Sequence, residues 1–397
     1  MQNMSHTKVP ERVFNLYMNS CTMLHSTRPA HIYMYTIIAC FILFVLLYAR
    51  PKLCKDLPDD GSYISHERTN MINGIFIWIV FLSHLSSYGT SLHGPDTYIL
   101  RLTGRMGQAM VSTFFFFTGY GIMTSLLRKG TTYATQLITH RFMRLWFHFC
   151  SAVLIYLLVQ YCIGKTYPLS HILYSFAGWE RIGNSNWFIF MTLLSYLLIA
   201  ISYKLLYRKG ILFVIGGILL LFICAIPLYH LKGSYWVNTF LGIPAGMLYC
   251  IMQKHIESLL KKTRLPIGII GIICFVSGWE TFLYFQRTTS IVSILLQNAG
   301  SILFAMGVCF IFAGIRLSRK PTFLIWSGGS ALFYLYIFQR IPMLLGEHFE
   351  LNIHHSFLYQ AGCTSITILI AWICCRIFPR LDALIWRTTT AKHKKSD

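Results

Sequence analysis

The stretch TNMINGIFIWIVFLSHLSSY, residues 69–88, is a run of mostly apolar residues that carries a histidine deep in its length. About twenty such residues make a helix that spans a bilayer. His84 follows Asn73 by eleven residues, or about three turns, so the two side chains share a face and lie roughly 16 Å apart along the axis. A polar side chain inside a membrane helix indicates a functional site by default. A neutral histidine bonded to a neighbouring helix is the competing interpretation.

The composition is typical of a polytopic helical membrane protein. Hydrophobic residues make up 55% of the chain and charged residues 12%, and the mean hydropathy is +0.56, whereas about a quarter of the residues of a soluble protein are charged. The net charge of +21 does not indicate nucleic-acid binding, because Lys and Arg cluster between apolar runs, as topology signals do. The 12 cysteines form no C-x-x-C pair, so we expect neither a disulfide framework nor a metal site.

Apolar windows predict an all-α protein with about eleven membrane spans. We expect a polar N-terminal extension over residues 1–30, an extra transmembrane helix and cytoplasmic linker over 31–67, a membrane domain over 68–380 and a basic cytoplasmic tail over 381–397. The predicted spans are residues 32–49, 71–88, 109–127, 145–163, 187–203, 211–228, 236–252, 267–285, 291–315, 323–345 and 357–377.

The basic residues orient these spans. If the spans alternate strictly, the basic segments after the third, fifth, seventh, ninth and eleventh spans share one side, which the positive-inside rule makes cytoplasmic. We therefore expect a multi-pass protein of the plasma (inner) membrane with a cytoplasmic C-terminus and an outer N-terminus. His84 then lies in the outer half of its helix, and Asn73 lies near the cytoplasmic end.

Arg141 and Arg144 stand at the cytoplasmic mouth of the fourth span and share one helical face. Guanidinium groups match phosphate oxygens, so the pair is a candidate phosphate site; two further positive-inside charges are the simpler interpretation. His148, four residues further on, is expected to be a satisfied partner rather than a catalyst. Of the 13 acidic residues only Glu280 falls inside a span, which argues against an ion-coupled transporter and leaves acid–base chemistry to His84.

Five segments, in this order, resemble acyltransferase family 3, a family of integral-membrane O-acyltransferases. The first, INGIFIWIVFLSH at residues 72–84, is similar to the family's pattern of a basic residue, ten residues and His, with Asn73 where Arg or Lys is usual. Arg68 is no substitute, because sixteen residues of helix put it nearly opposite His84. The other segments are VSTFFFFTGYGIM at 111–123, HRFMRLW at 140–146, NSNWFIFMTLLSYLL at 184–198, and GGSALFYLYIFQRIP at 328–342, where Gln339 stands at a position in which histidine is common.

The resemblance implies a ten-helix acyltransferase core, preceded by span 32–49. It also implies an O-acyltransferase that moves an acyl group, most often acetyl, from cytoplasmic acyl-CoA to a hydroxyl of a cell-surface carbohydrate. His84 would be the general base or a transient acyl carrier, and Asn73 would donate a hydrogen bond to the thioester carbonyl or the pantetheine. Arg141 and Arg144 would bind the CoA phosphates. Candidates for lining the acceptor side are Asn186, Trp187, Gln339 and Arg340.

The implied partners are the carbohydrate acceptor, membrane lipids and glycan-assembly proteins, with acetyl-CoA as co-substrate and no metal or nucleic acid. Two other functions stay open. A transporter or flippase for a lipid-linked glycan would share the number of helices and the basic loops. A membrane scaffold or sensor that has lost catalysis is suggested by Asn73 alone.

Overall fold

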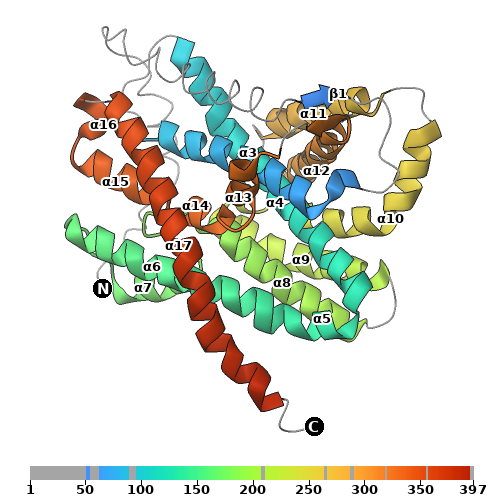
Figure 1. Ribbon diagram of the computed structural model, residues 1–397, viewed down its shortest axis with the longest axis horizontal. Coiled ribbons are helices and arrows are strands. Elements are labelled where there is room, and N and C mark those ends of the chain that lie inside the picture. The colour runs from blue at the N-terminus through green and yellow to red at the C-terminus, as the bar shows by residue number, and fades with distance from the viewer. Residues whose placement is uncertain are drawn as a thin grey trace, which may run out of the picture.

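The computed structural model describes residues 51–53, 62–88, 95–206, 211–262, 266–286, 290–317, 320–354 and 356–393. The predicted extension over 1–30 and the predicted span 32–49 lie outside these residues. The described chain is almost entirely helical (Figure 1), and eight of the helices in it are long and apolar enough to cross a membrane. The protein is therefore an all-α polytopic membrane protein, as its composition predicts.

The long helices lie where apolar windows predict spans. A helix suits an apolar run of this length because it bonds all of its backbone polar groups internally, as the hydrocarbon core requires. They are α3 (His66–Ser86), α4 (Pro95–Lys129), α6 (Met143–Cys162), α8 (Trp187–Leu205), α9 (Ile211–Lys232), α11 (Ile267–Phe285), α12 (Ile291–Ala313) and α17 (Ser356–His393). Helix α17 crosses the front of the molecule, and its C-terminal end extends beyond the other helices (Figure 1).

Shorter elements join these helices. The helix α5 (Thr131–Gln136) and the π-helix η2 (Leu137–Phe142) lead into α6, and α7 (Leu169–Phe176) follows it, in a region that the sequence presents only as a polar loop. The strands β1 (Pro51–Leu53) and β2 (Ile315–Leu317) form one antiparallel pair. The remaining short elements are the 3₁₀-helices η1 (Ser62–Ile64) and η3 (Ser234–Trp236) and the helix α16 (Leu351–His354).

Two of the predicted spans do not form a single long helix. Residues 236–252 begin with the end of η3 and a turn, after which α10 (Gly242–Lys262) continues well past the predicted end. Residues 323–345 form three short helices, α13 (Thr322–Gly328), α14 (Leu332–Phe338) and α15 (Arg340–His348). Neither segment is among the eight membrane-length helices, so the count of about eleven spans stays a prediction.

Helix α3 lies inside the bundle and packs closely on α13 and α4. At Gly328 of α13, an added Cβ would stand 1.9 Å from the backbone oxygen of Asn70 and 2.1 Å from the backbone nitrogen of Gly74. The two backbones therefore touch, which small residues allow in membrane helices. The Trp78 indole nitrogen donates a hydrogen bond to Ser327 Oγ at 3.2 Å in the same interface.

The first turn of α3 is tied to the end of α12. The Arg68 guanidinium donates to the Phe312 carbonyl at 2.9 Å, where the unsatisfied carbonyls of a helix C-terminus attract a cation. This contact holds the Arg68 side chain against the end of α12.

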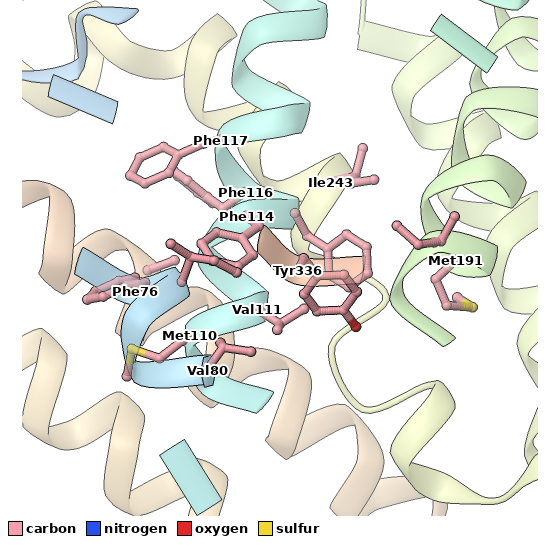
Figure 2. Close-up of a cluster of buried hydrophobic side chains, with 14 of the residues drawn as sticks. Phe76, Val80, Met110, Val111, Phe114, Phe116, Phe117, Met191, Ile243 and Tyr336 are labelled. Atoms are coloured by element: carbon pink, nitrogen blue, oxygen red, sulfur yellow. The ribbon is translucent and has the colours of Figure 1, made fainter. Parts of the chain in front are cut away.

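An aromatic core surrounds the middle of the bundle. Figure 2 shows Tyr336 of α14 among apolar side chains of α3, α4, α8 and α10. The Tyr336 ring lies 5.1 Å from that of Phe188, which lies 4.8 Å from that of Phe115. All four side chains of the run 114–117 are buried, so these phenylalanines pack in the core. This core holds α14 rigidly between the other helices.

Candidate active site

The C-terminal end of α3 meets the junction between α14 and α15. Gln339 and Arg340 occupy this junction, and both side chains lie close enough to act electrostatically on His84. The rings of His84 and Tyr336 are tilted, with centroids 6.4 Å apart. The structure therefore brings two candidate acceptor residues, from a distant part of the chain, to the candidate catalytic histidine.

Several buried polar atoms around this junction have no partner among the described residues. They include His84 Nδ1, Gln339 Oε1 and the Tyr336 hydroxyl. Gln339 is fully buried, and its amide nitrogen donates to the Tyr336 carbonyl at 2.8 Å, so its oxygen remains free to accept. Buried polar groups are normally satisfied, and a concentration of unsatisfied ones calls for an explanation such as a bound substrate.

Arg340 is held by two residues that sequence reasoning missed. Its Nε donates to Ser185 Oγ at 2.9 Å, and its Nη1 lies 3.4 Å from the Tyr88 hydroxyl. Tyr88 is itself fixed, because the Asn352 amide donates to its carbonyl at 2.7 Å. Burial raises the pKa of the Tyr88 phenol, although the charge of Arg340 acts in the opposite direction.

A loop between α7 and α8 supplies Ser185. Gly183 has φ +98°, and a Cβ there would meet Gln160 Nε2 at 2.6 Å, so the glycine lets the loop turn against α6. The Asn186 amide nitrogen donates to the Gly178 carbonyl at 2.7 Å, within the same loop. The structure thus places Asn186 in the support of the loop and Ser185 at the guanidinium.

Trp187 begins α8 and lies in the aromatic core. Its ring contacts those of Phe115 and Tyr235 edge-on, with centroids 6.2 Å away in each case. The described contacts of Trp187 are all with aromatic rings. Its predicted role on the acceptor side stays a prediction.

Asn73 lies near the opposite end of α3 from His84. Its side chain is buried, and its Oδ1 has no hydrogen-bond partner in the described residues. The break between α13 and α14 lies beside this part of α3, since a Cβ on Gly329 would meet the Asn70 amide at 2.9 Å. The α14 helix connects Gly329 to Gln339, and its seven residues give about 10 Å of helix along the stretch of α3 from Asn73 to His84.

Non-helical backbone at membrane depth is tolerated where it is enclosed by protein or lines a polar cavity. The segment α13–α15 has one such break, at Gly329 beside the Asn73 end of α3, where φ is −104° and ψ is −104°. Gln339, beside His84, keeps helical dihedrals (φ −55°, ψ −27°), so the α14–α15 junction interrupts only the helical hydrogen bonding. An unbroken helix would satisfy its own backbone, so the break at Gly329 is a second sign that the Asn73 end of α3 is functional.

Arg141 and Arg144 flank the change from the π-helix η2 to α6. Arg141 is exposed and interacts with the phenols of Tyr133 and Tyr196, whereas Arg144 is partly buried with an unpaired Nε. A π-helical turn re-aims side chains and is frequent at functional sites. The two cations are three residues apart in the chain, and the π-helix alters the simple helical spacing on which the sequence argument relied.

The arginine pair and the histidine cluster lie at different depths. The Tyr156 hydroxyl of α6 donates to the Ile337 carbonyl at 2.8 Å, which puts Tyr156 near the level of the α14–α15 junction. Arg144 precedes Tyr156 by twelve residues, or about 18 Å of helix. The structure thus separates a cationic end from the His84 end by most of a membrane helix.

His148 is paired with Asp382 of α17, with Nε2 and Oδ1 3.0 Å apart. Four aromatic rings surround the imidazole, that of Phe378 most closely at 4.6 Å between centroids. The expectation that His148 is a satisfied partner is confirmed.

The model of one protein family, that of the acyltransferase domain of acyltransferase family 3, matches residues 70–376. The match covers most of the chain and includes α3, the arginine pair and the broken helix α13–α15. The chain belongs to acyltransferase family 3. None of the curated proteins and none of the solved structures compared with the chain matches it.

Membership of acyltransferase family 3 makes the protein a membrane acyltransferase and supports O-acyl transfer in general. The two regions described above, one with Arg141 and Arg144 and the other with His84, contain groups suited to such a reaction. A base with a free nitrogen can take a proton from a hydroxyl, and a pair of guanidinium groups can bind a phosphorylated donor.

Proposed function

We propose that the protein transfers an acetyl group from cytoplasmic acetyl-CoA to a hydroxyl of a cell-surface carbohydrate, with His84 as the general base. The observation that carries the proposal is the unpaired, buried Nδ1 of His84, with the Gln339 side chain within reach of the imidazole. A structural histidine would be satisfied by its neighbours, as His148 is by Asp382.

In this proposal His84 removes the proton of the acceptor hydroxyl as the oxygen attacks the thioester carbonyl. Gln339 accepts the remaining ring N–H of the neutral imidazole and so fixes its tautomer. The proton returns to the sulfur that leaves when the thioester bond breaks. This sequence moves one proton and one acyl group and leaves the protein unchanged.

The acyl donor, acetyl-CoA, would enter at the end of the helix bundle that carries the two arginines. Arg141 and Arg144 would bind the phosphates of CoA, and the unpaired Oδ1 of Asn73 is suited to accept an amide N–H of the pantetheine arm. This assignment reverses the direction of the hydrogen bond expected from sequence, because the buried unsatisfied atom of Asn73 is the acceptor. An extended pantetheine arm would bridge the distance between the arginine level and His84.

The cell-envelope assignment is part of the proposal. The positive-inside rule puts the arginine end in the cytoplasm, together with the C-terminus, and the His84 end at the outer face of the plasma membrane. Donor and acceptor would then approach from opposite sides. Membrane lipids and glycan-assembly proteins are the partners that such a reaction implies.

The test is transfer of radiolabelled acetyl from acetyl-CoA in membranes that contain the protein, with His84→Ala as the inactive variant. His255→Ala is the matched control, because His255 is exposed on α10 and far along the chain from the site. Label in a carbohydrate fraction that is lost only with His84→Ala supports the proposal. Equal transfer by the His84→Ala protein would refute it and favour a scaffold or transport role for the histidine.

A further inference from the structure

Arginine side chains bring positive charge to the surroundings of His84. Arg340 is partly buried at the α14–α15 junction, and Arg181 is exposed in the loop that supplies Ser185. Neither arginine has an ion-pair partner in the part of the chain that the structure describes. A guanidinium has five N–H donors, and the hydrogen bonds of Arg340 use only two of them.

The two arginines converge on the same pair of phenols. Desolvation raises the pKa of Tyr88 and of Tyr235, and the charges of both Arg181 and Arg340 oppose it at each phenol. Arg340 also lies over the Tyr88 ring, with its guanidinium carbon 5.9 Å from the centroid. Arg181 and Arg340 thus both act on the surroundings of Tyr88 and Tyr235, Arg181 from an exposed position and Arg340 from a partly buried one.

The neighbouring carboxylates leave this region positive. Glu180 is engaged by Lys232 at 2.8 Å, and that ammonium also lies 4.4 Å from the centre of the Trp179 ring. Glu347 acts on Tyr88 from α15, but its carboxylate is exposed, so solvent and salt screen its charge. The buried Tyr336 hydroxyl, which has no hydrogen-bond partner among the described residues, belongs to the same junction and can donate to a bound ligand.

We infer that the acceptor is anionic, and that a carboxylate or phosphate group next to the reacting hydroxyl is bound between Arg181 and Arg340. Guanidinium forks bind both kinds of oxyanion in pairs of charge-assisted hydrogen bonds. Arg181 attracts the acceptor at the surface, and Arg340 sets its hydroxyl beside His84. The inference rests on the proposed function, since it names the class of acceptor for that reaction.

The experiment compares three oligosaccharides of one backbone: a neutral glycan, the same glycan with a uronate carboxylate, and the same glycan with a phosphomonoester. The full chain is reconstituted in phosphatidylcholine vesicles, so that no anionic headgroup competes, and acetyl transfer from acetyl-CoA is measured. We expect a KM about tenfold or more lower for one or both anionic glycans than for the neutral one. The carboxylate and phosphate arms show which oxyanion is preferred.

Arg181→Gln tests the exposed part of the proposed anion site and leaves Arg340 and His84 unchanged. Its side chain is exposed, and His171 contacts only its backbone carbonyl, so the fold should be unchanged. We expect a KM for anionic glycans raised by roughly two- to fivefold, more at low salt, with no change for the neutral glycan. Lys165→Gln, at another exposed basic residue between α6 and α8, should change none of these values.

Arg340→Gln should remove the preference for an anion and raise the KM for anionic glycans by roughly 10- to 100-fold. Transfer to the neutral glycan as efficient as to the anionic ones, or equal losses on all three glycans in Arg181→Gln, would overturn the inference while leaving the proposed function standing. Absence of transfer to every glycan would overturn both.

Discussion

His148 Nε2 lies 3.0 Å from Asp382 Oδ1, and this contact joins α6 to α17 four residues beyond Arg144. Both side chains are largely buried, with 15% and 18% of their surfaces exposed. The pair therefore braces the first turns of α6, the helix that carries Arg144. Its role in the fold is to keep that helix in place at the cationic end of the molecule.

Asp382→Asn should destabilise the protein by about 1–3 kcal/mol, because the neutral amide oxygen is a weaker acceptor than the carboxylate and the contact loses its charge. The measurement is thermal or denaturant unfolding of purified protein in detergent. The KM for acetyl-CoA should rise only slightly, since Asp382 does not itself contact the donor in this proposal. Unchanged stability would show that the pair contributes nothing to the fold.

Arg141→Gln and Arg144→Gln should each raise the KM for acetyl-CoA by roughly 10-fold and leave kcat nearly unchanged, because they remove binding that the substrate and the transition state share. The variant that has lost the contact to the 3′-phosphate should no longer distinguish acetyl-CoA from its 3′-dephospho form. Arg128→Gln is the control, since Arg128 is an exposed cation at the end of α4. A fall in kcat alone would contradict the assignment.

Asn73→Leu should reduce acyl transfer at least tenfold while the stability stays the same or rises by about 1 kcal/mol, because the change removes a buried acceptor that has no partner. Acetyl transfer and unfolding are measured on the same preparations. Loss of stability with full activity would mean that Asn73 serves the fold instead of the reaction.

Gly328→Ala should prevent normal folding, since the new methyl group would meet the backbone of α3 at 1.9 Å and neither backbone can move away freely. We expect a loss of more than about 3 kcal/mol, seen as little folded protein in the membrane fraction. Gly121→Ala is the matched control in α4, because a Cβ there meets nothing within 4 Å. Normal yields of both variants would show that α3 and α13 do not touch as described.

Those parts of the fold that depend on local sequence could be predicted. Each long helix coincides with an apolar run, because hydrophobic length alone decides whether a segment can span a bilayer. His84 and the arginine pair were identified by spacing within single helices. The break at Gly328 and Gly329 was visible as two adjacent glycines, but the apolar window averages over such a pair and predicts one span.

Contacts between distant segments could not be predicted. Arg340 binds Ser185 across 155 positions and Tyr88 across 252, and no pattern within one helix encodes those pairings. The π-helical turn before Arg144 depends on packing rather than on periodicity. Asn186 was singled out for its polarity, whereas the neighbouring Ser185 makes the contact to the guanidinium, a difference of one residue that loop geometry decides.

The broken helix α13–α15 also bears on how the protein is assembled. None of its three pieces has the length of a membrane-spanning helix, and at the Gly329 break lipid could not satisfy the exposed backbone groups. We therefore expect this segment to take its final form only against neighbouring helices. It requires α3 and α6 to be in place first, so the site would form only after the earlier helices have been inserted and have left a gap between them.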